Sequence, residues 1–525
     1  MVLSRKKGST FYLDSRGNPI ENERKISLSL KPNSKGRGIQ YELHCAYTSP
    51  NAHSSFGDTP LIPSPAFVRL IVGCFSCVTV SLLANFAQAV EPSEALAAYV
   101  QKADDSYGWK VRSQTKIGPC SVNELILTSQ TWRDLVWQHR LFVIVPEGVA
   151  EETDAVLVIG GGSWKEEYAE TPAGGETSLP KEASLLSVYA QQIGCPVAVL
   201  LNVPRQPIFD GRREDEIIAL TFDKYLKTGE SDWPLLLPMV KSAVRAMDAM
   251  QEFAAQKLDI KIDGFTVTGA SKRGWTTWLV SAVDPRVQGL APMVIDTLNM
   301  EAQLKHQIAS YGKPSQQIED YTELDLHRRM ATEEGTNLRT IVDPYSYRDQ
   351  ITQPKLIFLG TNDAYWTVDS LNLYWNDLKG KKYVVYVPNA GHGLANDWLR
   401  IFGGLRALRR HVDDLKPLPN LDWNYTEATG DQPLKLDVTP NEKAAMVKLW
   451  TADAPTRDFR QSKWTSQVVP RSEAGNALSE IARPESGYRA AFAEVTYSHD
   501  KVPFYLSTTM RVLEAKDTEK VGGGE

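Results

Sequence analysis

Strand-length apolar runs alternate with longer stretches of helical spacing over residues 124–412, and this alternation constrains the fold more than any other feature. The predicted buried strands are 155–163, 195–204, 264–271, 289–297, 355–363 and 383–393. The predicted helices are 178–194, 233–258, 272–283 and 397–413. Alternation of this kind predicts a mostly parallel sheet with helices on both faces. Glycines or polar residues follow these strands, at the sheet edge where ligands bind in such folds.

Three further regions complete the predicted domain organisation. Residues 124–132 and 137–148 indicate two neighbouring, antiparallel strands ahead of the parallel ones. Residues 297–350 show no strand pattern and are interpreted as a helical insertion over the ligand-binding edge. Short alternating stretches after residue 423 predict a small β-sandwich domain over 424–515, appended to a catalytic domain over 90–420.

The N-terminal part of the sequence differs from the rest. Residues 1–65 are polar and basic without apolar periodicity, which indicates a disordered segment or a spurious extension. An apolar run then ends in Ala87-Gln88-Ala89, a small-x-small cleavage pattern, so 66–89 is interpreted as a signal peptide. A signal-anchor helix is the competing interpretation, because the apolar run could just span a bilayer. Cleavage would give a secreted or periplasmic protein without a stable membrane span.

Composition and charge narrow the range of functions. The net charge is −6, so nothing indicates the basic face of a nucleic-acid binder. The sequence contains no metal-binding motif and no Walker lysine, so we expect no metal and no cofactor. Cys120 and Cys195 follow the predicted cleavage site, and in an exported protein they could form a disulfide. The sequence does not show whether they are close, so their pairing stays open.

Ser271 lies in the stretch GASKRGW, directly after a predicted strand and before a predicted helix. A strand, a tight turn carrying serine and a helix make up the nucleophile elbow of serine hydrolases. Gly269 and Ala270 provide the small residues that this turn needs. Arg273 occupies the position of the usual second glycine, and Gly274 comes one residue later. The alternative is an ordinary turn in which Ser271 caps the helix.

A serine nucleophile needs a base, and the base needs an orienting carboxylate. His392 lies in a glycine-flanked loop after the last predicted core strand, where an imidazole could reach Ser271. Asp363 follows the preceding strand, and Asp369, six residues further on, is the alternative. Ser271, Asp363 and His392 follow the chain order of α/β-hydrolase triads, each at the end of a strand.

The tetrahedral intermediate of acyl transfer needs hydrogen-bond donors for its oxygen. We predict the backbone amide of Lys272 as one donor and those of Gly161 and Gly162 as the second. The side chain of Lys272 could add positive charge there, or it could pair with acids on the surface, which is the interpretation favoured for Arg273. Three aromatic residues are predicted to line the substrate pocket, with the hydrophobic core as the alternative: Trp275, Tyr365 and Trp366.

Several of these segments resemble the PhoPQ-activated pathogenicity-related family. The resemblance lies in SQTWR, VPRQPI, WPLLLPMVKSAV, residues 269–287, APMVIDTLNM, residues 359–375 and VPNAGHGL. It runs from about residue 95 to 515 and implies an α/β-hydrolase fold and export, but no particular substrate. The serine followed by a basic residue is also similar, more distantly, to the elbow of glucuronoyl esterases, which implies ester cleavage.

Two functions follow from these residues. The first is an exported serine hydrolase that cleaves a small-molecule ester or a peptide. The second is a secreted binding or signalling protein on a hydrolase scaffold, because a fold does not fix a function. Within the enzyme class, the acid-rich run 212–216 would favour a peptidase if it lined a cleft for a substrate amine, but a solvated surface is its simpler interpretation.

Overall fold

The structure is a computed structural model that describes residues 90–170, 179, 183–427, 432–441 and 443–515. The predictions for residues 1–65 and 66–89 lie outside the described residues. Within the described part, no helix is both long enough and apolar enough to cross a bilayer.

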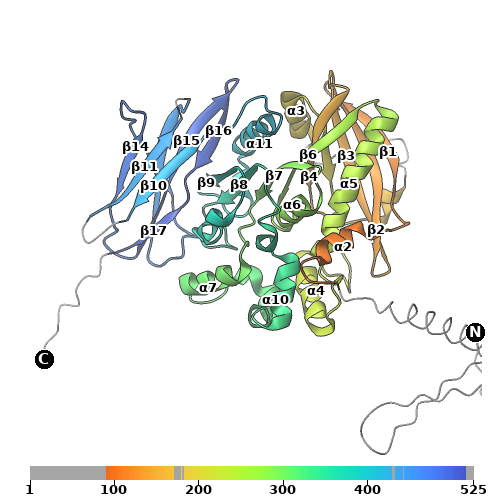
Figure 1. Ribbon diagram of the computed structural model, residues 1–525, viewed down its shortest axis with the longest axis horizontal. Helices are drawn as coiled ribbons and strands as arrows, with labels where there is room; N and C mark the ends of the chain where they lie inside the picture. The colour runs from red at the N-terminus through yellow and green to blue at the C-terminus, as the bar shows by residue number, and fades with distance from the viewer. Residues whose placement is uncertain (1–89, 171–178, 180–182, 428–431, 442, 516–525) are drawn as a thin grey trace, which may run out of the picture. The chain divides into compact units, whose positions relative to one another are not determined.

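A long mixed sheet forms the centre of the described chain (Figure 1). Its strand order begins β1-β2-β3-β5-β4-β6-β7-β8-β9. These strands are β1 (Gly108–Ile117), β2 (Cys120–Trp132), β3 (Leu135–Pro146), β4 (Glu152–Ile159), β5 (Val197–Leu200), β6 (Lys261–Ala270), β7 (Val287–Met293), β8 (Lys355–Gly360) and β9 (Lys382–Val387). Strands β1, β2, β3 and β5 pair antiparallel, and the strands from β5 through β4 and β6 to β9 are parallel. The predicted α/β-hydrolase fold is therefore confirmed.

Helices cover both faces of this sheet because its strands are apolar on both faces. In β4, Ala155 and Leu157 are buried in one apolar core, and Val156 between them is buried in the other. The helices of the first core include α2 (Ala95–Gln101), α4 (Glu214–Thr228), α5 (Leu236–Lys257) and α6 (Lys272–Val283). Helices α3 (Ala183–Ile193) and α11 (Trp398–Val412) contribute to the second core.

The predicted helical insertion consists of short helices between β7 and β8. They include α7 (Met300–Tyr311), α8 (Glu319–Glu323), α9 (Leu326–Arg329), α10 (Glu333–Val342) and the 3-10 turn η3 (Pro344–Tyr347). Helices α8, α9 and α10 all contact α4, and Figure 1 shows α7 and α10 beyond one end of the parallel strands. The insertion thus lies over the carboxyl edge of the sheet, where the candidate site is.

The C-terminal strands both extend the central sheet and form a smaller one. They are β10 (Leu421–Thr426), β11 (Leu434–Pro440), β12 (Met446–Ala454), β13 (Thr465–Val468), β14 (Ala477–Ile481), β15 (Tyr488–His499), β16 (Val502–Ser507) and β17 (Arg511–Glu514). Strand β16 pairs with β9 at Ser507 and Val384, so β16, β15, β12 and β13 continue the long sheet. Strands β10, β11 and β14 form a separate antiparallel sheet that shares an apolar core with β12 and β15.

Strand β1 and helix α4 are among the elements that were not predicted from the sequence. Strand β1 lies at the edge of the sheet, is mostly polar, and has only one buried residue, Ser113, so it lacks the apolar run of a buried strand. Helix α4 begins with the three acids Glu214, Asp215 and Glu216, which were interpreted as a solvated surface. Cys120 and Cys195 are buried free thiols, so the structure leaves them unpaired.

Candidate active site

Ser271 has the backbone conformation of a strained turn between β6 and α6. Its φ is 57° and its ψ is −127°, which few residues with a side chain adopt. Such a conformation costs of order 1–3 kcal/mol and persists where the surrounding structure imposes it. The Ser271 side chain accepts no capping hydrogen bond from α6, contrary to the helix-cap alternative. Its hydroxyl is therefore not committed to capping the helix.

Two glycines allow this turn to be tight. A Cβ on Gly269 would lie 2.7 Å from the backbone oxygen of Arg273, so β6 and α6 approach each other too closely for a side chain there. A Cβ on Gly274 would lie 2.8 Å from Ile295 and 2.9 Å from the oxygen of Gly269. Gly274 thus provides the second close approach, and the departure from the usual glycine spacing leaves position 273 free for a long side chain.

The structure places His392 against Asp363. The Nδ1 atom of His392 lies 2.9 Å and 3.1 Å from the two carboxylate oxygens of Asp363, so it can donate to them. Asp363 is buried, and it also accepts a hydrogen bond of 2.9 Å from the backbone amide of Tyr365. The centroid of the Tyr365 ring lies 4.3 Å from the centroid of the His392 imidazole. A carboxylate on Nδ1 leaves Nε2 as the atom that can accept a proton.

Asp369, the alternative carboxylate, has other partners. It lies 2.7 Å from Nε2 of His306 and 2.6 Å from Nη2 of Arg457. Burial raises the pKa of Asp369, but the hydrogen bond and charge of His306 and the charge of Arg457 outweigh it and lower that pKa. The structure therefore assigns Asp363, and not Asp369, to His392.

Ser271 and His392 open onto the same cavity, which has a volume of about 360 Å³. The cavity lies between the sheet edge and the helical insertion, because its walls come from α4, from α6 to α10 and from the segments that follow β6, β7, β8 and β9. Trp275, Tyr365 and Trp366, the three predicted pocket residues, all line it. The indole of Trp275 donates a 2.6 Å hydrogen bond to the backbone oxygen of Val342, so this ring also anchors α10.

The predicted oxyanion donors lie around the same turn. The amide of Lys272 belongs to the first turn of α6, where backbone N–H groups lack partners within the helix. Gly161 and Gly162 follow β4, and Gly162 has a φ of +104°, which only glycine adopts readily. A Cβ on Gly161 would lie 2.5 Å from the guanidinium of Arg273, so the glycine loop packs directly on that side chain.

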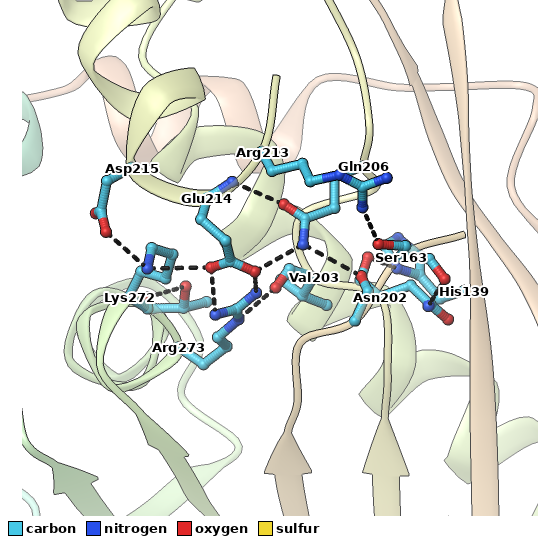
Figure 2. Close-up of polar contacts among 12 residues, drawn as sticks. His139, Ser163, Asn202, Val203, Gln206, Arg213, Glu214, Asp215, Lys272 and Arg273 are labelled. Carbon is cyan, nitrogen blue, oxygen red and sulfur yellow. Dashed lines mark hydrogen bonds and ion pairs between the residues drawn. The ribbon is translucent and has the colours of Figure 1, made fainter. Parts of the chain in front are cut away.

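The side chains of Lys272 and Arg273 form ion pairs with the start of α4 (Figure 2). Lys272 Nζ lies 3.0 Å from Glu214 and 3.1 Å from Asp215. Arg273 binds Glu214 through two hydrogen bonds of 2.7 and 2.8 Å, and its Nε donates to the backbone oxygen of Val203. Both cations are buried, and the side chains of Glu214 and Asp215 are 38% and 17% exposed, so these two acids lie at the surface and are also paired with the turn at Ser271.

Glu214 is the centre of this network. Its carboxylate also accepts a 2.6 Å hydrogen bond from Gln206, and its backbone amide donates to the Gln206 side chain. Gln206 in turn donates to the backbone oxygen of Gly162. Burial raises the pKa of Glu214, but Arg273, Lys272 and Gln206 outweigh it and lower that pKa to about 2. Glu214 is therefore an anion at neutral pH that links the turn at Ser271 to the glycine loop at Gly161 and Gly162.

The family-model comparison matches residues 96–460 to the PhoPQ-activated pathogenicity-related protein family. This chain belongs to that family. A second comparison finds Autocrine proliferation repressor protein A of Dictyostelium discoideum, 32% identical over 442 residues that cover 78% of this chain and 87% of that protein. The family membership and the strand order agree with the resemblance seen in the sequence.

Solved structures of esterases are similar to this member of the family at low identity. Acetyl xylan esterase 1 from Thermoanaerobacterium sp. JW/SL YS485 is 15% identical, with a TM-score of 0.40 over 57% of this chain and 88% of that one. An acetyl xylan esterase from Paenibacillus sp. R4 is 13% identical, with a TM-score of 0.41 over 60% of this chain and 92% of that one. Neither similarity indicates a substrate for this protein.

Sequence reasoning missed Glu214 and Gln206 as residues of the site. Glu214 is 59 residues away from Arg273 in the sequence, and no local pattern connects the two. The one available signal was the arginine at the usual glycine position, because a cation that is buried there requires an acidic partner. The acid-rich run 212–216 was the nearest group of candidates for that role.

Proposed function

We propose that this protein is an exported serine hydrolase that cleaves a carboxylic ester or amide. One observation carries the proposal: a serine in a strained elbow conformation opens onto the same cavity as a histidine held by a buried aspartate. Nucleophile, base and orienting acid are the three parts that acyl transfer by serine requires.

In the proposed mechanism, the Ser271 hydroxyl attacks the substrate carbonyl and His392 accepts its proton at Nε2. Asp363 keeps the other ring nitrogen protonated and stabilises the imidazolium. Backbone amides of Lys272 and of Gly161 or Gly162 donate to the developing oxyanion. His392 then protonates the leaving group, and water releases the acyl group from Ser271 by the reverse sequence.

Substitution of the nucleophile tests this function. In Ser271→Ala, hydrolysis of 4-nitrophenyl butyrate should fall by roughly three to six orders of magnitude, because the covalent step is lost. Ser281→Ala is the matched control, since Ser281 is a buried serine of α6 whose hydroxyl donates to the backbone oxygen of Thr277. Turnover in Ser271→Ala equal to that of the wild type would rule the proposed function out.

Export is the second part of the proposal and rests on the apolar run with its Ala87-Gln88-Ala89 end. Protein recovered outside the cytoplasm should begin at Val90, which mass spectrometry of the intact chain would show. A chain that keeps residues 66–89 and sediments with membranes would support the signal-anchor interpretation instead.

A secreted signalling protein is the second candidate, because a relative at 32% identity is named an autocrine proliferation repressor. The two candidates separate in one assay, in which purified wild-type protein and Ser271→Ala are added to the cells that produce the protein. A growth effect that both proteins cause equally would favour signalling without turnover.

A further inference from the structure

The cavity beside Ser271 and His392 has mainly apolar walls. Its volume of about 360 Å³ falls in the range of small-molecule sites. The apolar side chains come from α4, from α6, from the segment after β7 and from the insertion, and they include Phe222, Trp275, Val294, Ile295, Met300 and Leu304. An occupant that reaches Ser271 therefore contacts hydrocarbon over much of its length.

The amide side chains in the wall are already bonded within the protein. Gln303 donates to the backbone oxygens of Leu298 and Ser370, both at 3.2 Å. Gln307 donates to the oxygen of Tyr365 at 2.7 Å and accepts from the amide of Ser315 at 2.8 Å. A polar ligand would have to compete for these bonds, whereas an apolar ligand leaves them intact.

The two carboxylates in the wall are also occupied. Asp215 lies 3.1 Å from Lys272 Nζ and accepts a 2.9 Å hydrogen bond from the Tyr321 hydroxyl. Glu301 lies 2.6 Å from Lys305 and 3.1 Å from Arg339. Among the described residues that line the cavity, each acid thus has a cationic partner. An incoming substrate ammonium group would have to displace a lysine or arginine, which argues against an aminopeptidase.

We infer that the cavity holds the apolar acyl chain of an ester whose carbonyl carbon Ser271 attacks. The inference rests on the proposed function and specifies its substrate class. The bond between the carbonyl carbon and the alcohol oxygen breaks, the bond from that carbon to Ser271 Oγ forms, and the serine proton passes through His392 to the departing alcohol. Water then hydrolyses the acyl-enzyme, which releases a fatty acid and regenerates the Ser271 hydroxyl.

Chain-length dependence of hydrolysis tests the inference. For 4-nitrophenyl esters from acetate to dodecanoate, kcat/KM should rise about four-fold per added methylene until the cavity is full. Leu304→Trp reduces the space, so its best substrate should be a shorter ester than that of the wild type. Val188→Trp is the matched control, because Val188 is exposed on α3, against the other face of the sheet, and the chain-length profile should not change.

Ligand binding without turnover separates this inference from the proposed function. By titration calorimetry, Ser271→Ala should bind octanoate at least ten-fold more tightly than acetate, and Leu304→Trp in the same background should weaken octanoate binding. A flat chain-length profile, a peptide cleaved faster than any ester, or no preference for octanoate over acetate would overturn the inference. Octanoate binding without hydrolysis of any ester by the wild type would uphold the apolar site and overturn the hydrolase function.

Discussion

Two aspartate–histidine pairs, whose aspartates lie six residues apart along the chain, have different surroundings. Asp363 and His392 are 2.9 Å apart, and His392 opens onto the cavity that contains Ser271. Asp369 and His306 are 2.7 Å apart, but neither is among the described residues that line the cavity, and Arg457 neutralises the carboxylate. The first pair has the arrangement of a catalytic base, and the second has that of a structural link between α7 and the loop after β8.

The comparison shows that contact between a carboxylate and an imidazole does not identify an active site. The two pairs differ in that only the first lies at the cavity onto which the strained turn at Ser271 opens. A structural ion pair is neutralised from all sides, whereas a catalytic base keeps one ring nitrogen available for the substrate.

The largest expected effect is on activity. His392→Ala should lower kcat/KM by about 10⁴-fold, and Asp363→Asn by a similar factor, because the proton acceptor or its tautomer is lost. His306→Ala is the matched control and should change kcat/KM less than about three-fold. Kinetics with 4-nitrophenyl butyrate measure both. Equal losses in His392→Ala and His306→Ala would remove the distinction between the pairs.

The second pair should matter for stability instead. Asp369→Asn should lower the free energy of unfolding by about 3–5 kcal/mol at pH 7, because it leaves the Arg457 charge without its buried partner. The pKa of Asp369 is lowered in the folded protein, so its stabilisation is present above the unfolded pKa and is lost as pH falls through the folded pKa. Urea unfolding at pH 7 and pH 3 should therefore show a smaller difference at pH 3. A large loss of kcat in fully folded Asp369→Asn would contradict this role.

A third carboxylate, Glu214, should affect activity only indirectly, because it positions Arg273 against the loop at Gly161. Glu214→Gln removes the charge that holds Arg273 under Gly161, so kcat should fall by about 10²-fold while KM changes little. Glu216→Gln is the matched control, since Glu216 is an exposed acid in the same first turn of α4. Steady-state kinetics on variants with native circular dichroism would measure the effect. A change confined to melting temperature would make Glu214 structural only.

The smallest effect concerns Asp296, a buried acid whose carboxylate accepts a 2.6 Å hydrogen bond from Tyr374. Burial, reinforced by the charges of Asp363 and Asp369, raises the pKa of Asp296 to about 7. Its stabilising contribution is present below the unfolded pKa and is lost as pH rises through about 7. From pH 5.5 to 6.5 the wild type should lose about 1 kcal/mol relative to Asp296→Asn in urea unfolding. Parallel pH profiles of the two proteins would contradict the raised pKa.

The parts of the fold that could be predicted from the sequence are those marked by patterns within one short stretch of residues. Strands β4, β6, β8 and β9 are apolar runs followed by glycine or polar residues, so their type and the order of Ser271, Asp363 and His392 could be predicted. Strand β1 could not, because an edge strand with mixed exposure has no apolar run. The central sheet continues from β9 to β16 through pairing between residues far apart in sequence. This continuation could therefore not be predicted from local patterns.

The same division applies to the candidate site. The turn at Ser271 follows from the adjacent small residues, but the role of Gly274 required the contacts with Ile295 and Gly269. Glu214 and Arg273 are far apart in the sequence and meet only in the folded chain. The ion pair between them could therefore not be predicted from the sequence. Charged residues at a site are poorly predicted from sequence, because their partners and not their types determine whether they are buried.

The most direct test of the central claim is covalent labelling of the folded full-length chain with a fluorophosphonate probe, followed by mass spectrometry of the digested protein. An active serine displaces the leaving group of the probe, and its base sets the rate. We predict an adduct on Ser271 in the wild type and in His306→Ala, and its loss in His392→Ala. Absence of an adduct on the folded wild type, or equal labelling of Ser271 in His392→Ala, would contradict the assignment of His392 and Asp363 to Ser271.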